Sequence, residues 1–127
     1  MRVYETTKTV KKDDLDELNH VNNVRYVQWV QDIAKAHWND YASDDIRNKN
    51  FWVLLSHTID YKGAALLGEV IQLKTYVTSH HGATCHRTVE MHLNEKCIVK
   101  SETKWCLLSH ATQRPTRISP EIVELFY

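Results

Sequence analysis

Apolar residues recur at helical spacing in one long segment of the chain, from Asn23 to about Asn39. Steps of three and four residues place its apolar side chains along one stripe, with charged and amide side chains opposite. The stripe contains Val24, Val27, Val30, Ala34 and Trp38, with Ile33 and His37 beside it, and the opposite face carries Arg25, Gln28, Asp32 and Lys35. This pattern predicts an amphipathic helix whose wide stripe packs against the rest of the domain.

Most of the remaining chain has the composition and the alternation typical of β-strands. The expected strands cover residues 2–11, 51–61, 69–79, 83–93 and 97–109. Alternation places Ile71, Leu73, Thr75, Val77, Val89, Met91 and Leu93 inward, and His86, Thr88, Glu90 and His92 outward. We also expect a helical turn at 43–47 and a short C-terminal helix that begins at Ser119-Pro120, because proline suits a first helical position.

This order of elements predicts an α+β domain in which one long helix packs on a five-stranded antiparallel sheet. We expect the last four strands to follow one another across the sheet as an antiparallel meander. A single helix covers only one face of such a sheet. The apolar residues of the other face and the unpaired edge strands therefore predict a homodimer or a homotetramer.

Composition narrows the class of protein. The 127 residues predict one domain over residues 1–127, and 16 basic and 16 acidic residues leave no net charge. Neither a nucleic-acid partner nor a membrane partner is expected, because there is no basic excess and no apolar run of membrane-spanning length. The three cysteines form no Cys-x-x-Cys motif, so we expect reduced thiols in a cytoplasmic protein.

Polar residues crowd the segment that leads into the long helix. They are Asp14, Asp16, Asn19, His20, Asn22 and Asn23. Asp and Asn are common before helices, since they cap the first turn and favour the helix dipole, and one such residue is enough for that purpose. The number of polar residues here favours a functional site at the start of the helix, with capping as the alternative interpretation.

The sequence Asp-Leu-Asp-x-x-x-His-Val-Asn-Asn-x-x-Tyr-x-x-Trp at 14–29 resembles the active-site segment of hotdog-fold acyl thioesterases. It is most similar to the 4-hydroxybenzoyl-CoA thioesterase group, including the plant acyl-carrier-protein enzymes. Segments 59–70 and 103–107 resemble the family's second-strand and last-strand signatures. The resemblance implies a hotdog fold and hydrolysis of an acyl-CoA or acyl-carrier-protein thioester, with no metal and no cofactor.

The resemblance also assigns roles at the site. Asp16 would be the catalytic carboxylate, acting as the nucleophile or activating a water, His20 would polarise or orient the reacting groups, and Asn23 would face the thioester. An Asp is ionised at neutral pH, and free amides at a helix start can stabilise an oxyanion. Two positions depart from the plant enzymes, because Leu18 replaces an Asn and Ala64 replaces a Glu.

These departures keep a second hypothesis open, a non-catalytic protein that binds acyl thioesters. A hydratase or dehydratase ranks lower, because the His-Phe-Pro type of motif of such hotdog proteins is absent. A purely structural interaction domain would leave the polar helix start unexplained.

Other candidate residues have simpler interpretations. Metal ligation by His80, His81, Cys85 and His86 is disfavoured, because strand alternation points the last two to opposite faces and no zinc spacing is matched. We interpret His37 and His57 as core or interface histidines, and the four tryptophans as core, although Trp52-Val53-Leu54 could line an acyl tunnel. Phosphates of CoA or phosphopantetheine could meet Arg87, Lys100, Lys104, Arg114 and Arg117, but scattered solvated charges are the favoured interpretation.

Overall fold

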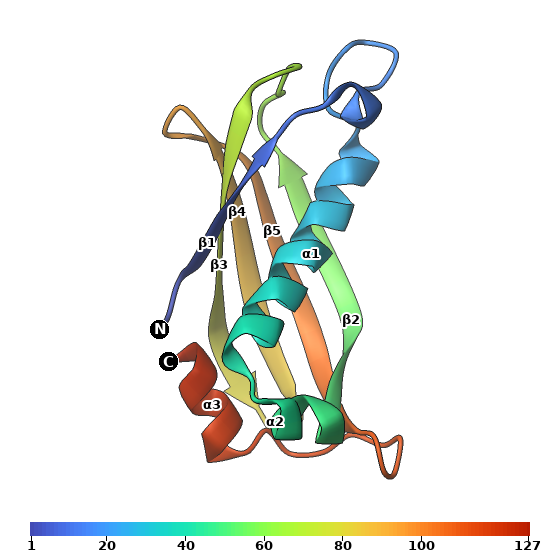
Figure 1. Ribbon diagram of the computed structural model, residues 1–127, viewed down its shortest axis with the longest axis vertical. Coiled ribbons are helices and arrows are strands. Elements are labelled where there is room, and N and C mark those ends of the chain that lie inside the picture. Colours follow the sequence, from blue (N-terminus) through green and yellow to red (C-terminus); the bar gives the residue numbers. More distant parts are fainter.

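One five-stranded sheet and one long helix across its face make up most of the computed structural model, which describes residues 1–127 (Figure 1). The elements in chain order are β1 (Tyr4–Thr9), a 3₁₀ turn (Lys12–Asp14), α1 (Asn23–Tyr41), α2 (Asp44–Lys49), β2 (Asn50–Tyr61), β3 (Val70–His81), β4 (Thr84–Leu93), β5 (Lys96–Ser109) and α3 (Pro120–Phe126). All strand pairs are antiparallel. The α+β class and the five-stranded antiparallel sheet predicted from the sequence are confirmed.

The strand order corrects the predicted meander. The sheet runs β1-β3-β4-β5-β2, so β2 pairs with β5 at one edge and does not neighbour β3. The connector between β2 and β3, residues 62–69, crosses the end of the sheet. Figure 1 shows this end of the sheet beside the start of α1. Alternation along a strand shows which side chains share a face, but it does not show which strand lies next to it. The pattern alone therefore could not determine that β2 pairs with β5.

Backbone hydrogen bonds hold this connector against three parts of the fold. The Gly63 N–H donates to the Ile98 carbonyl at 3.2 Å, the Val21 N–H donates to the Ala65 carbonyl at 3.0 Å, and the Gly68 N–H donates to the Val10 carbonyl at 3.0 Å. A β-carbon on Gly63 would lie 3.0 Å from Ile98 Cγ2, so the close approach to β5 favours glycine there. The connector thereby fixes the residues just before α1.

The helix α1 begins at a clear cap. Asn22 is the N-cap residue, and its Oδ1 accepts the Val24 N–H at 3.0 Å. The side buried against the sheet carries Tyr26, Trp29, Val30, Ile33, Ala34, His37 and Trp38. Val24 is 71% exposed, so its predicted place in the apolar stripe was wrong. Turning Tyr26 and Trp29 inward buries more apolar surface than turning Val24 inward, and burial of a large side chain contributes roughly 1.5–3 kcal/mol.

The core lies between α1 and the sheet face that the alternation predicted. Ile71, Leu73, Val89 and Met91 pack with the first half of α1. A second cluster joins the end of α1 to β5 and α3, with Trp38, Leu107 and Phe126 among its members. No helix of the chain has the length and apolarity needed to cross a membrane.

Candidate active site

Asp16 lies in a tight loop that closes immediately before α1. Leu15 and Val21 form an antiparallel bridge, and the Asp16 N–H donates to the His20 carbonyl at 2.8 Å. Asn19 turns the chain with φ of 61°, a conformation that asparagine tolerates better than most residues. The sequence between the two bridge residues therefore folds back on itself as one compact turn.

The Asp16 carboxylate is tied into this loop through one oxygen. Oδ1 accepts the Leu18 N–H at 2.9 Å and the His20 N–H at 3.3 Å, whereas Oδ2 accepts no hydrogen bond from the protein. The residue is half-buried. One oxygen is thus held by backbone amides, and the other is available to a water or to a substrate carbonyl carbon.

Asp14 has a different environment from Asp16. It is buried, and its Oδ2 accepts the Lys11 N–H at 2.8 Å, which caps the 3₁₀ turn. Its Oδ1 lies 3.5 Å from Nε of Arg25, and Nη2 of Arg25 also donates to the Asp13 carbonyl at 3.1 Å. Asp14 therefore anchors the loop to α1, while capping of α1 itself belongs to Asn22. The capping interpretation thus holds for two of the polar residues and not for Asp16.

The other two predicted site residues, His20 and Asn23, lie at the end of the Asp16 loop and at the start of α1. His20 is exposed, and its contact with Asp16 is made by its backbone. Asn23 is the first residue of α1, its carbonyl oxygen accepts the Tyr61 hydroxyl at 3.4 Å, and its N–H has no acceptor in the protein. The structure therefore brings Asp16, His20 and Asn23 together at the positive end of the helix, without a side-chain hydrogen bond between them.

Exposed apolar side chains lie on this loop and on the segments next to it. Leu18 in the loop is 69% exposed, and the exposed group also includes Val24 on α1, Tyr61 at the end of β2, and Leu66 and Leu67 on the connector. The side chains that replace the Asn and Glu of the plant enzymes, Leu18 and Ala64, are both exposed. Apolar side chains therefore occupy both of these positions.

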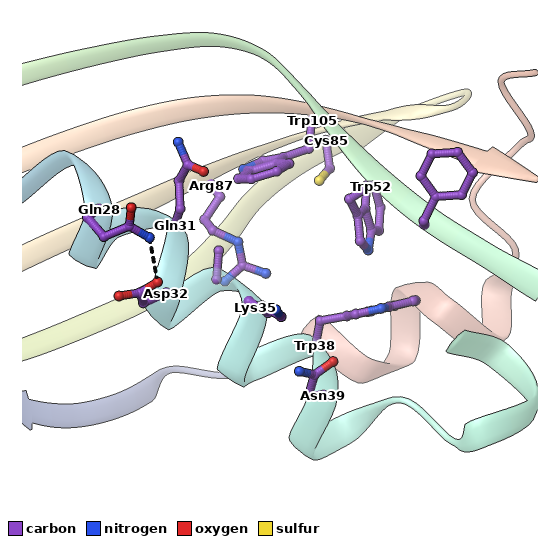
Figure 2. Close-up of a pocket in the computed structure, with 12 residues that line it drawn as sticks. Gln28, Gln31, Asp32, Lys35, Trp38, Asn39, Trp52, Cys85, Arg87 and Trp105 are labelled. Carbon is purple, nitrogen blue, oxygen red and sulfur yellow. Dashed lines mark hydrogen bonds between the residues drawn. The ribbon is translucent and has the colours of Figure 1, made fainter. Parts of the chain in front are cut away.

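A cavity of about 410 Å³ lies between α1 and the sheet and begins farther along the helix (Figure 2). Its lining includes Trp38, Phe51, Trp52 and Trp105. Of the predicted tunnel residues Trp52, Val53 and Leu54, only Trp52 lines it. Gln28 lies about 8 Å along the helix axis from Asn23, at 1.5 Å per residue, so the cavity starts about one turn and a half beyond the loop.

Arg87 lines the same cavity, and this corrects its interpretation as a solvated charge. It is 5% exposed, and its Nη1 hydrogen-bonds with His37 Nδ1 at 3.0 Å and donates to Thr75 Oγ1 at 2.9 Å. Burial lowers the pKa of the Arg87 guanidinium to about 10, and burial raises the pKa of the neighbouring Cys85 thiol to about 11. Alternation in β4 contained the signal, because Arg87 shares the inward phase of Val89 and Met91.

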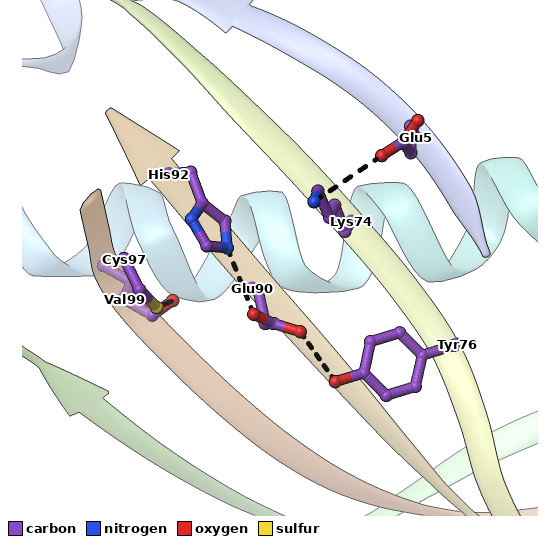
Figure 3. Close-up of polar contacts among 7 residues, drawn as sticks. All are labelled: Glu5, Lys74, Tyr76, Glu90, His92, Cys97 and Val99. Atoms are coloured by element: carbon purple, nitrogen blue, oxygen red, sulfur yellow. Dashed lines mark hydrogen bonds and ion pairs between the residues drawn. The ribbon is translucent and has the colours of Figure 1, made fainter. Parts of the chain in front are cut away.

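A second polar cluster occupies the other face of the sheet (Figure 3). The Tyr76 hydroxyl donates to Glu90 Oε2 at 2.7 Å, and His92 Nε2 lies 3.1 Å from Glu90 Oε1. Cys97 pairs with His92 across the β4–β5 ladder, and the ligand atoms of Glu90, His92 and Cys97 all lie within 4.8 Å of one another. These three side chains are of the types that bind Zn²⁺. The sequence interpretation missed them, since it did not fix the hairpin register.

The histidines considered as metal ligands behave as the sequence suggested. His80, His81 and His86 are exposed, while Cys85 is buried on the opposite side of β4 from His86. His37 is fully buried in the core, and His57 Nε2 hydrogen-bonds with Ser101 Oγ at 2.9 Å. Burial lowers the pKa of His57 below its ordinary value.

Solved structures share this architecture. A predicted thioesterase from Bacillus stearothermophilus superposes with a TM-score of 0.86 at 17% identity, covering 98% of this chain and 94% of that one. A 1,4-dihydroxy-2-naphthoyl-CoA thioesterase from Synechocystis gives 0.84 at 11% identity, with coverages of 98% and 96%. A thioesterase from Thermus thermophilus, complexed with coenzyme A and Zn, gives 0.84 at 19% identity, with coverages of 96% and 90%. The fold is therefore the hotdog fold, as predicted.

The sequence itself identifies the family. The family model for the acyl-ACP thioesterase N-terminal domain matches residues 1–126, and the chain belongs to that family. No curated protein matches the sequence. Family membership and fold together support thioester hydrolysis as the general activity, in agreement with the resemblance of segment 14–29.

Proposed function

We propose that this protein hydrolyses an acyl-CoA or acyl-carrier-protein thioester with Asp16 as the catalytic carboxylate. The observation that carries the proposal is the position of Asp16, held through Oδ1 by two loop amides beside the start of α1. Its Oδ2 is the group that acts. The Asn23 N–H, which has no acceptor in the protein, would donate to the oxyanion that forms on the thioester carbonyl.

Two routes use the same carboxylate. In the first, Oδ2 takes a proton from a water, and the oxygen of that water attacks the thioester carbonyl carbon. In the second, Oδ2 attacks the carbon itself and forms a mixed anhydride, which water then hydrolyses. In both routes the C–S bond breaks, the thiol leaves as a thiolate that is then protonated, and the acyl group becomes a carboxylic acid.

The remaining site residues have supporting roles in this proposal. The exposed His20 ring would orient the thioester or polarise its carbonyl, and Asn23 would face the thioester at the helix start. The apolar side chains around the loop, Leu18 and Val24 among them, would shield the reacting bond from bulk water and so strengthen the electrostatic contribution of the amides.

We also propose that the chain forms a homodimer through β2, with a homotetramer as the larger alternative. β2 has 12 residues and pairs only with β5, so its other edge presents unpaired backbone groups. Val53 and Leu55 on this strand are 37% and 53% exposed. The three cysteines are free, which fits a reducing compartment, and we propose the cytoplasm.

A non-catalytic acyl-thioester binding protein is the second candidate, favoured by Leu18 and Ala64 at positions where the plant enzymes have polar groups. One experiment separates the two. The purified protein is incubated with short-chain, long-chain and aromatic acyl-CoAs, and with acyl-carrier-protein thioesters, while a thiol reagent reports released thiol. We expect release from at least one substrate class. Binding without release over the whole panel would support the second candidate instead.

A further inference from the structure

The cavity beside α1 contains a buried cation without a carboxylate partner. Nη1 of Arg87 bonds with His37 and Thr75, while Nε and Nη2 have no hydrogen-bond partner in the protein. Figure 2 shows the guanidinium group directed from β4 toward α1, within the residues that line the cavity. Its other face lies against the Phe126 ring, with 5.4 Å between Cζ and the ring centroid. The free N–H groups are therefore available to a ligand in the cavity.

The neighbours of Arg87 do not neutralise it. No salt bridge is formed by Arg87, and burial and the guanidinium keep the pKa of His37 at about 4, so its ring is neutral at pH 7. At the mouth of the cavity, the exposed Asp32 accepts from Gln28 Nε2 at 2.8 Å, and the exposed Lys35 supplies a second cation. The cavity is thus positively charged overall. A buried charge without a partner is destabilising, which argues for a role other than stability.

The rest of the lining is suited to an organic acyl group. The side chains of Trp38, Phe51, Trp52 and Trp105 provide apolar walls, and a volume of about 410 Å³ lies within the range for small-molecule sites. A saturated fatty chain would fill this space but would leave the guanidinium without a partner. A group with an anionic oxygen would satisfy both the walls and the cation.

We propose that this cavity binds the acyl group of the substrate, and that Arg87 pairs with a carboxylate or phenolate which that group carries away from its thioester. The inference rests on the proposed thioesterase function. The thioester would lie at the start of α1, and the acyl group would extend along the helix past Gln28 to the guanidinium. The guanidinium bonds with His37, which is 14 residues beyond Asn23, or about 21 Å along the helix axis at 1.5 Å per residue. Only a long acyl chain spans that distance, so the substrate class is a long-chain acyl thioester with a carboxylate or another anionic oxygen at its far end.

The test uses amide analogues of CoA thioesters, in which nitrogen replaces the thioester sulfur, so that binding is measured without turnover. The matched pair carries a hexadecanedioyl group, which ends in a carboxylate, or a hexadecanoyl group, which ends in a methyl, and calorimetry gives each Kd. We expect the wild type to bind the carboxyl analogue about 10- to 100-fold more tightly, as hydrogen bonds to charged groups suggest. In Arg87→Met this preference should disappear, with the Kd of the methyl analogue unchanged. Arg114→Met, at an exposed arginine outside the cavity, should retain the preference.

Equal binding of the two analogues by the wild type would overturn the proposal, and so would an undiminished preference in Arg87→Met. The wild-type comparison requires no variant, so it decides the matter even where Arg87→Met fails to fold. A clear preference for the carboxyl analogue, in a protein that hydrolyses no thioester, would keep the cavity assignment and reject the proposed hydrolysis. The two proposals therefore fail separately.

Discussion

Nη1 of Arg87 and Nδ1 of His37 are hydrogen-bonded at 3.0 Å in the interior of the protein. Arg87 can only donate, so Nδ1 accepts, and the proton of the neutral ring resides on Nε2. Nε2 is buried without a partner. Burial, and then the Arg87 charge, lower the pKa of His37 from 6.5 to about 4. This pair links the candidate substrate cavity to the stability of the fold.

Acidification should therefore destabilise the protein well above the pH at which carboxylates titrate. The unfolded chain protonates His37 near pH 6.5, but the folded protein does so only near pH 4. The contribution of His37 to the free energy of unfolding is fully present above pH 6.5 and is lost as the pH falls toward 4. Between pH 7 and pH 5 the loss is about 2 kcal/mol. Urea unfolding at the two pH values measures this difference.

His37→Gln is the variant for this prediction, since its amide oxygen can still accept from Arg87. Most of the pH dependence between 7 and 5 should be absent in it, with a remainder from His57, whose pKa is also lowered. The exposed His86→Gln should behave as the wild type. An unchanged pH dependence in His37→Gln would show that His37 is not the group responsible.

Loss of the helix cap should weaken the fold by a modest and predictable amount. Asn22 Oδ1 accepts the Val24 N–H at 3.0 Å, and removal of such a cap typically costs about 1 kcal/mol. Asn22→Ala should lower the free energy of unfolding by that amount in chemical denaturation. Asn48→Ala, at an exposed position within α2, serves as the control. Equal stability of the two variants would contradict the capping assignment.

A charge on β2 should dissociate the proposed dimer. Leu55 is 53% exposed on the strand with the unpaired edge, so Leu55→Lys would place an ammonium group in the interface, where desolvation opposes association. Light scattering coupled to size exclusion should show the monomer mass for this variant. Leu67→Lys, on the connector and exposed to a similar extent, should keep the mass of the wild type. A wild type that elutes as a monomer would refute the proposed assembly.

Much of the fold could be predicted because its signals are local. The period of α1, the inward phase of Ile71 and Leu73, and the capping of the helices all depend on nearby residues. The edge position of β2 could not be predicted from the same signals. It depends on the path of the connector, which is fixed by contacts of Gly63 and Ala65 with residues distant in sequence.

In the candidate site, too, features that depend on nearby residues could be predicted, and features that depend on contacts between distant residues could not. Asp16, His20 and Asn23 lie within eight consecutive residues, so one sequence motif was enough to bring them together. Arg87 and His37 are far apart in the chain, and their contact requires α1 to cross β4 at a definite place. Phase within β4 could have indicated that Arg87 is buried. Only the packing of α1 on the sheet could indicate its partner.

The central claim is that the Asp16 carboxylate performs the chemistry, and Asp16→Asn tests it most directly. The asparagine oxygen can still accept the Leu18 and His20 N–H groups, so the loop should keep its shape while the negative charge is lost. On the best substrate of the panel, we expect kcat/KM to fall by about 10²- to 10⁴-fold, the usual loss for a general base. Glu17→Gln, which removes an exposed charge from the same loop, should change it little. Full activity in Asp16→Asn would contradict the mechanism.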